Sequence, residues 1–115
     1  MAAILKKNIL LVEDDPKLSF VLKTLLEERG CDVTVCHSAA EARQLNHNGV
    51  DVAVLDVRLP LELGTELAEH LRTKHGRLKI IFVTGYDDLE RSKPAIDHAA
   101  LLVKPFSFDA LWALL

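Results

Sequence analysis

Short runs of branched apolar residues alternate along this chain with longer segments in which apolar residues recur at helical spacing. Each short run predicts a β-strand. The run that ends at Asp56 has almost no polar alternation, which favours a strand covered on both faces, as in a parallel sheet. The five predicted strands are residues 8–12, 32–36, 50–56, 79–84 and 101–104.

The first two helices are predicted from the residues that cap them. Asp15 can accept hydrogen bonds from the free N–H groups of a helix start, and Pro16 suits the first helical position because no donor is needed there. Gly30 ends this helix. Ser38, with Glu41 three residues later, forms a capping box for a second, short helix.

The third helix follows a loop around Pro60. It begins near Gly64, and its apolar stripe is predicted to consist of Leu63, Leu67 and Leu71. Strands alternating with helices through short connections predict a parallel sheet with right-handed crossovers, and therefore an α/β fold.

The last part of the chain is less regular. Residues 85–98 are rich in polar side chains and contain Pro94, so we expect a short or mobile fourth helix there. Ser107 is a candidate cap for a last helix. The chain ends before that helix would be complete. We therefore expect residues 1–115 to form one domain, either a stand-alone protein or, with its last helix truncated, one domain of a longer protein.

Composition narrows the class of protein. The net charge of -3, without a cluster of basic residues, argues against direct binding of nucleic acid. No apolar run has the length of a membrane span, and the N-terminus lacks the features of a signal peptide. Cys31 and Cys36 are expected on opposite faces of one strand, as reduced and buried thiols. We therefore expect a cytoplasmic protein without membrane association.

Polar side chains stand at the ends of four predicted strands. They are Glu13 and Asp14 after the first, Asp56 after the third, Thr84 after the fourth and Lys104 after the fifth. In the flavodoxin-like strand order 2-1-3-4-5, these four strands are neighbours and their carboxyl ends meet at one edge. The expected fold is thus a doubly wound (βα)5 sheet with these groups together.

Three neighbouring carboxylates repel one another unless a cation lies among them, and Mg²⁺ prefers oxygen ligands. We expect Asp14 to bind Mg²⁺ directly and Glu13 to bind it through water. One oxygen of Asp56 would bind the metal while the other attacks phosphorus, and Thr84 and Lys104 would hold the transferred group. Taken singly, each residue also has an ordinary role in a cap, a strand or an exposed loop.

The chain resembles response regulator receiver domains over essentially its whole length, and four stretches match the motifs of that family. They are ILLVEDDP at 9–16, LDVRLP at 55–60 with Gly64, FVTG at 82–85 and KPF at 104–106. The resemblance implies that Asp56 receives phosphate from a histidine kinase or phosphotransfer protein. It also implies that the Arg58 backbone carbonyl joins the metal ligands and that the bond between Lys104 and Pro105 is cis.

The chain departs from the usual receiver pattern at one switch residue. Receivers usually carry an aromatic residue three positions before the lysine, and this chain has Leu101 there. Residues 82–86 instead resemble a receiver subgroup nicknamed FAT GUY. This likeness makes Tyr86 the candidate aromatic that gates or reports the site; the alternative is an ordinary loop tyrosine.

Three classes of function remain to be weighed. The first is a phosphorylation-controlled switch that acts on an output domain or a downstream protein and is not a turnover enzyme. The second is an unphosphorylated interaction scaffold with the same fold. The third, an aspartate-nucleophile phosphatase, is disfavoured because such enzymes carry a second acid where this chain has Arg58, whose side-chain role stays open. The five histidines show no metal-ligand spacing.

Overall fold

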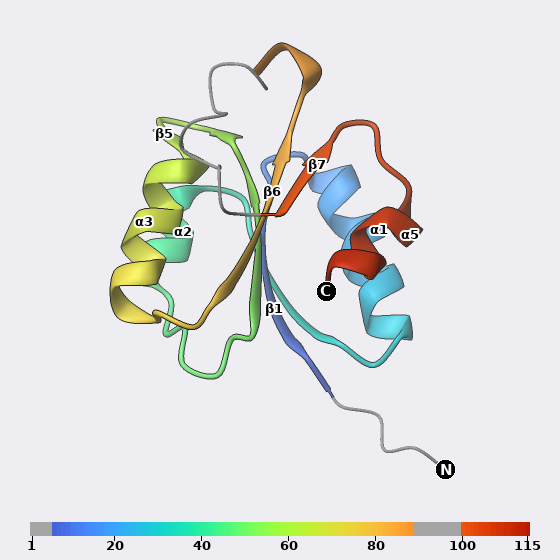
Figure 1. Cartoon of the computed structure of the whole chain (residues 1–115), viewed down its shortest axis with the longest axis horizontal. Coiled ribbons are helices and arrows are strands. Elements are labelled where there is room, and N and C mark those ends of the chain that lie inside the picture. The colour runs from blue at the N-terminus through green and yellow to red at the C-terminus, as the bar shows by residue number, and fades with distance from the viewer. Residues whose placement is uncertain (1–5, 89–99) are drawn as a thin grey trace.

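Figure 1 shows the computed structural model, which describes residues 6–88 and 100–115. Its centre is a five-stranded sheet in the order β2-β1-β3-β6-β7, in which every pair of neighbours is parallel. Strands β4 (Arg58–Leu59) and β5 (Glu62–Leu63) form a separate hairpin, so β6 and β7 are the fourth and fifth strands of the main sheet. The predicted strand order 2-1-3-4-5 is therefore confirmed. The strands are β1 (Asn8–Val12), β2 (Asp32–Cys36), β3 (Val52–Asp56), β6 (Lys79–Thr84) and β7 (Ala100–Val103).

Helices cover both faces of this sheet. In Figure 1, α1 (Pro16–Glu28) and α5 (Phe108–Leu114) lie on one face, and α2 (Ala39–Gln44) and α3 (Gly64–Lys74) lie on the other. The predicted caps are present. Each cap side chain accepts a hydrogen bond from a backbone N–H inside the helix it starts. The capping residues are Asp15, Ser38 and Ser107.

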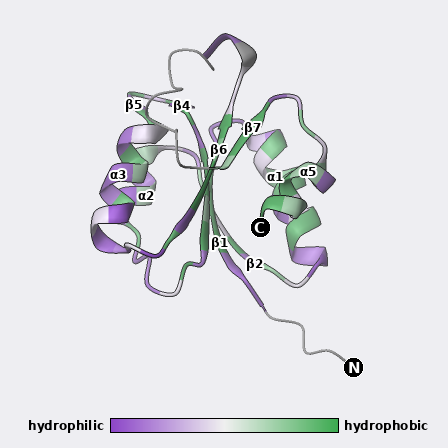
Figure 2. Cartoon of the chain, in the orientation of Figure 1, coloured by the Kyte–Doolittle hydropathy of each residue, from purple (hydrophilic) through white to green (hydrophobic). Residues whose placement is uncertain are grey.

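The core consists of two apolar layers separated by the sheet. Figure 2 shows apolar residues concentrated along the central strands and on the inward sides of the helices. All five residues of β3 are buried, because helices cover that strand on both sides. Cys31 and Cys36 are free and belong to opposite layers, as predicted. Burial raises the pKa of the Cys36 thiol to about 11, which keeps it protonated.

The loop predicted around Pro60 is a small hairpin instead. It consists of β4 (Arg58–Leu59) and β5 (Glu62–Leu63), paired antiparallel. The prediction for Leu63 was therefore wrong: its side chain is 49% exposed, whereas Leu67 and Leu71 are fully buried. Leu63 belongs to the hairpin and precedes the first helical turn, so the helical period does not apply to it.

Two further boundaries differ slightly from the prediction. Strand β3 begins at Val52, two residues after the predicted start, and β7 ends at Val103, which places Lys104 in the loop that follows. In the segment 85–98, residues Tyr86–Asp88 form a 3-10 turn, η1. The predicted fourth helix falls largely on residues 89–99, which lie outside the described part. Within the described ranges, every helix is too short or too polar to cross a bilayer.

Candidate functional site

Three carboxylates meet at the carboxyl edge of the sheet. Asp56 is the last residue of β3, and Glu13 and Asp14 follow β1, which pairs directly with β3. Each of the three offers one carboxylate oxygen, and these oxygens lie within 4.8 Å of one another. Glu13 and Asp56 are buried, whereas Asp14 is exposed. The convergence predicted for these three residues is present.

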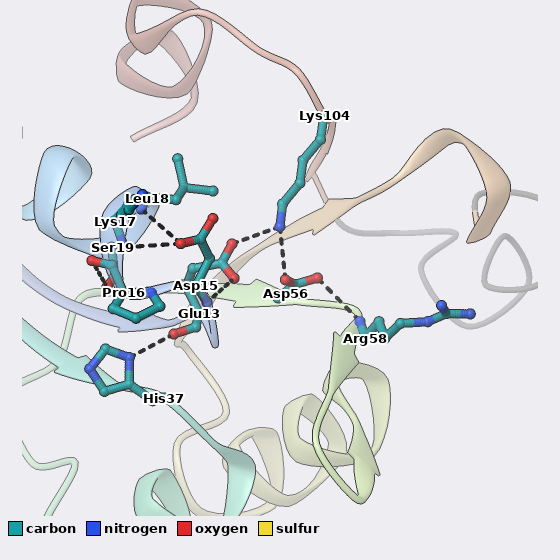
Figure 3. A network of polar contacts seen from close by, with 10 residues as sticks. All are labelled: Glu13, Asp15, Pro16, Lys17, Leu18, Ser19, His37, Asp56, Arg58 and Lys104. Atoms are coloured by element: carbon teal, nitrogen blue, oxygen red, sulfur yellow. Dashed lines mark hydrogen bonds and ion pairs between the residues drawn. The ribbon is translucent and has the colours of Figure 1, made fainter.

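Lys104 lies between two of these carboxylates, as Figure 3 shows. Its Nζ is 2.8 Å from Glu13 Oε1 and 3.0 Å from Asp56 Oδ2. Its backbone N–H donates to the Thr84 carbonyl at 2.8 Å, which fixes the residue at the end of β6. The Lys104–Pro105 peptide bond is cis. Sequence reasoning placed Lys104 near Asp56 but missed its contact with Glu13.

Backbone contacts hold the two buried carboxylates in place. The Glu13 N–H donates to the Cys36 carbonyl at 3.0 Å, and the Glu13 carbonyl lies 3.0 Å from Nδ1 of His37. The Asp15 N–H donates to Glu13 Oε2 at 3.1 Å. Similarly, the Arg58 N–H donates to Asp56 Oδ1 at 3.2 Å. Both side chains are therefore oriented before any ligand binds.

Gly64 makes the turn after Asp56 possible. A Cβ atom at this position would lie only 2.0 Å from the backbone oxygen of Asp56, a contact that no side chain tolerates. The Gly64 N–H donates to the Val57 carbonyl at 2.7 Å. The start of α3 is thus packed directly against the backbone of the acidic cluster, and only glycine fits there.

The charges of the cluster do not balance. Burial lowers the pKa of Lys104, but its hydrogen bonds to Glu13 and Asp56 outweigh this effect, so the pKa is raised overall and the amine stays charged. The pKa of Asp14 is raised, first by its hydrogen bond with Glu13 and then by burial and the charge of Glu13. One ammonium group therefore faces three carboxylates. This oxygen-rich, negatively charged cluster fits a divalent cation such as Mg²⁺.

The predicted site residue Thr84 directs its hydroxyl to a neighbouring backbone carbonyl and not to Asp56. The Thr84 side chain is buried at the end of β6, but its hydroxyl donates to the Gly85 carbonyl at 3.2 Å. Leu101, at the position of the usual switch aromatic, pairs with Phe82 across β6 and β7 and packs against the core. Tyr86 begins the turn η1, but its side chain lies outside the described part of the chain.

Sequence reasoning also missed Asp88. Its Oδ1 is 2.8 Å from a terminal nitrogen of Arg58. The Arg58 side chain, whose role the sequence did not decide, is therefore held by an ion pair. Asp88 lies 30 positions further along the chain, in a polar segment without a recognisable motif, and no spacing rule connects the two residues. Only the pairing of β3 with β6 brings them together.

The comparison with known families decides which family the chain belongs to. The sequence pattern described as the response regulator receiver domain matches residues 9–115. The chain belongs to the response regulator receiver domain family. As a receiver domain, it is part of the phosphoacceptor class of two-component signalling, and the family resemblance noted in its motifs is confirmed.

Curated relatives of this receiver domain are longer proteins. It is 32% identical over 111 residues to the uncharacterized transcriptional regulatory protein YkoG of Bacillus subtilis, covering 94% of this chain and 49% of that protein. It is 36% identical over 84 residues to the transcriptional regulatory protein CpxR of Escherichia coli, covering 73% of this chain and 36% of that protein. The chain thus spans about half of these relatives or less.

A solved structure with a bound ligand shares this fold. The response regulator protein TrrA of Thermotoga maritima, crystallised in complex with Mg(2+)-BeF, is 34% identical, with a TM-score of 0.81. The match covers 93% of this chain and 94% of TrrA. In the present receiver domain, the side chains of Glu13, Asp14 and Asp56 form a group that could hold a metal ion.

Proposed function

We propose that Asp56 is the phosphoacceptor of this receiver domain and takes a phosphoryl group from a phosphohistidine of a histidine kinase or phosphotransfer protein. The observation that carries the proposal is the position of Lys104, whose ammonium lies within 3.0 Å of both Asp56 and Glu13. A carboxylate is a weak nucleophile, and an adjacent fixed cation stabilises the negative charge that a phosphoryl group brings to it.

The residues that would hold Mg²⁺ are Glu13, Asp14, Asp56 and the backbone carbonyl of Arg58. When bound, Mg²⁺ would neutralise charge on the phosphoryl oxygens and relieve the repulsion among the carboxylates. The oxygens of the three acidic side chains already lie within 4.8 Å of one another, which supports this assignment.

The transfer is a simple displacement. An oxygen of Asp56 forms a bond to phosphorus while the bond between phosphorus and the donor imidazole nitrogen breaks, and the imidazole keeps the bonding electron pair. The product is an acyl phosphate on Asp56. Lys104 then pairs with a phosphoryl oxygen, and the Thr84 hydroxyl turns from Gly85 to a second one. Attack by water later releases inorganic phosphate and restores the carboxylate.

This cycle makes the domain a switch, since it acts on its own side chain and turns over no separate substrate. The added charge at Asp56 changes the positions of Thr84 and Lys104 and with them a surface for a partner. That partner is an output domain of a longer chain or a separate downstream protein, because the curated relatives are longer regulators. We propose that the domain receives phosphate in the cytoplasm, and its net charge of -3 argues against direct binding of nucleic acid.

The test is phosphorylation by acetyl phosphate with Mg²⁺, followed by intact mass measurement. We expect the native chain to gain the mass of one phosphoryl group, and we expect no gain without Mg²⁺ or with Asp56→Asn. Asp109→Asn removes an exposed carboxylate on α5 and should leave the gain unchanged. An equal gain on Asp56→Asn contradicts the proposal. A complete lack of adduct with both acetyl phosphate and a phosphorylated phosphotransfer protein also contradicts the proposal. That result would favour the unphosphorylated interaction scaffold.

A further inference from the structure

An ion pair joins strand β4, which follows Asp56, to the turn η1, which follows β6. The guanidinium of Arg58 lies 2.8 Å from Asp88 Oδ1, and the side chain of Arg58 is 70% exposed while that of Asp88 is only 18% exposed. The backbone N–H of the same arginine donates to Asp56. In Figure 3 its side chain extends away from the Asp56 carboxylate. Arg58 therefore contacts the acidic cluster through its backbone and Asp88 through its side chain.

Asp88 closes the turn that holds Thr84. Its N–H donates to the Gly85 carbonyl at 3.1 Å, and this bond forms the turn η1. The same carbonyl accepts the hydroxyl of Thr84 at 3.2 Å. One backbone oxygen thus joins the turn to the hydroxyl. As long as the turn keeps this shape, the hydroxyl has a hydrogen-bond acceptor other than a group on Asp56.

We propose that the Arg58–Asp88 ion pair is a latch that stabilises the turn of residues 85–88 and thereby keeps the Thr84 hydroxyl on Gly85. Charge on Asp56 opens the latch by competing with Asp88 for the guanidinium. The first part concerns the resting domain alone, and the second part rests on the proposed function of Asp56.

The competition follows from the chemistry of the arginine. A guanidinium binds phosphoryl oxygens as well as carboxylates, and its side chain has several rotatable bonds. A phosphoryl group brings a charge on the order of −2, against −1 for the carboxylate of Asp88. Because Arg58 is mostly exposed, its side chain can leave Asp88 without breaking core contacts. Loss of the Arg58–Asp88 ion pair frees the turn. The Thr84 hydroxyl can then leave the Gly85 carbonyl and donate to the phosphoryl group on Asp56.

The resting latch is tested by amide hydrogen exchange at position 88, in Arg58→Ala, Asp88→Asn and the double variant. After correction for intrinsic rates, either single change should speed exchange by about two- to five-fold, the range expected for an exposed ion pair. The double variant should exchange no faster than either single variant. Arg58→Lys should retain part of the protection, and Asp109→Asn, which removes a carboxylate from an exposed ion pair on α5, should change nothing.

These variants separate a latch from a general effect of charge. Arg58→Ala and Asp88→Asn change the net charge in opposite directions, so long-range electrostatics predicts opposite shifts, whereas a broken pair predicts equal ones. Opposite shifts, or additive effects in the double variant, would overturn the proposal.

The second part is tested by adding beryllofluoride with Mg²⁺ to the native chain. We expect exchange at position 88 to speed up, and we expect Asp88→Asn to bind the probe about two- to five-fold more tightly, because its turn is already released. Binding of the probe with unchanged exchange at position 88 contradicts the competition. A native chain that binds no beryllofluoride and gains no phosphoryl mass refutes the proposed function, while the result on the resting latch stands separately.

Discussion

The interior of the sheet and its carboxyl edge bury different kinds of surface within one strand. Residues Val52–Leu55 of β3 are apolar and at most 2% exposed, whereas Asp56, the next residue, is charged and only 6% exposed. On β1, the buried apolar residues Ile9–Val12 are likewise followed by buried Glu13. The change from apolar to charged side chains occurs within one residue on both strands.

The apolar interior of the sheet stabilises the fold, whereas the charged carboxyl edge lowers the stability of the fold and provides the residues of the candidate site. Burial of apolar side chains stabilises the fold in proportion to the area removed from water. Burial of carboxylates costs desolvation free energy, which a nearby cation only partly offsets. With three carboxylates around one ammonium, the edge is less favourable for the resting fold than an apolar edge would be. We therefore expect the two regions to respond differently to substitution.

The largest effect is expected in the interior. Leu67→Ala removes a fully buried side chain of α3 that packs against the sheet, and we expect a loss of about 2–5 kcal/mol in the free energy of unfolding. Urea denaturation measures it. Leu61→Ala, at a fully exposed position of the hairpin, should change stability by less than about 0.5 kcal/mol. Mg²⁺ should not reduce the loss in Leu67→Ala, because the core contains no charge for it to replace.

A smaller effect with a different dependence on Mg²⁺ is expected at the edge. Lys104→Met leaves Glu13 and Asp56 without their shared cation, and we expect a loss of about 1–3 kcal/mol in the absence of divalent ions. Mg²⁺ should recover part of this loss, since it supplies positive charge to the same oxygens. Unfolding curves with Mg²⁺ and with a chelator measure the recovery. Equal losses in the two conditions would remove the distinction between edge and interior.

The smallest effect concerns an ion pair that does not involve the acidic cluster. Arg43, on α2, pairs with Glu62, on the hairpin. Its hydrogen bonds and charge lower the pKa of Glu62 below the ordinary value of 4.5. A carboxylate with a lowered folded pKa contributes stability above its unfolded pKa, and the contribution is lost as the pH falls through the folded value.

We therefore expect Glu62→Gln to cost about 0.2–1 kcal/mol at neutral pH and nothing in acid. Unfolding of both chains from neutral pH to well below the ordinary pKa measures the difference. The control is Glu69→Gln, an exposed position on α3, whose cost should stay near zero throughout. A cost that grows on acidification would show that the sign of the shift is wrong.

Local sequence signals predicted most of the elements correctly. The caps at Asp15, Ser38 and Ser107 are formed by side chains within three residues of the groups they bind, so they do not depend on distant parts of the chain. The same holds for the apolar runs of the strands. The order of the strands was taken from a known fold and agrees with the structure.

The candidate site is only partly predictable in this way. The sequence indicated that Glu13, Asp14, Asp56 and Lys104 stand at strand ends, and a parallel sheet brings such ends to one edge. It did not indicate that Lys104 bridges Glu13 and Asp56, or that the Thr84 hydroxyl lies on Gly85. Those contacts depend on side-chain directions and on the shape of loops, which hydrophobic periodicity does not encode.

By itself, the sequence determined the alternating elements, the parallel sheet and the group of acidic and basic residues at its carboxyl edge, because each follows from local pattern. The hairpin at residues 58–63, the exposure of Leu63 and the ion pair between Arg58 and Asp88 were decided only by the tertiary structure. The physical reason is that these features join groups whose distance in space is set by the packing of separate strands and loops.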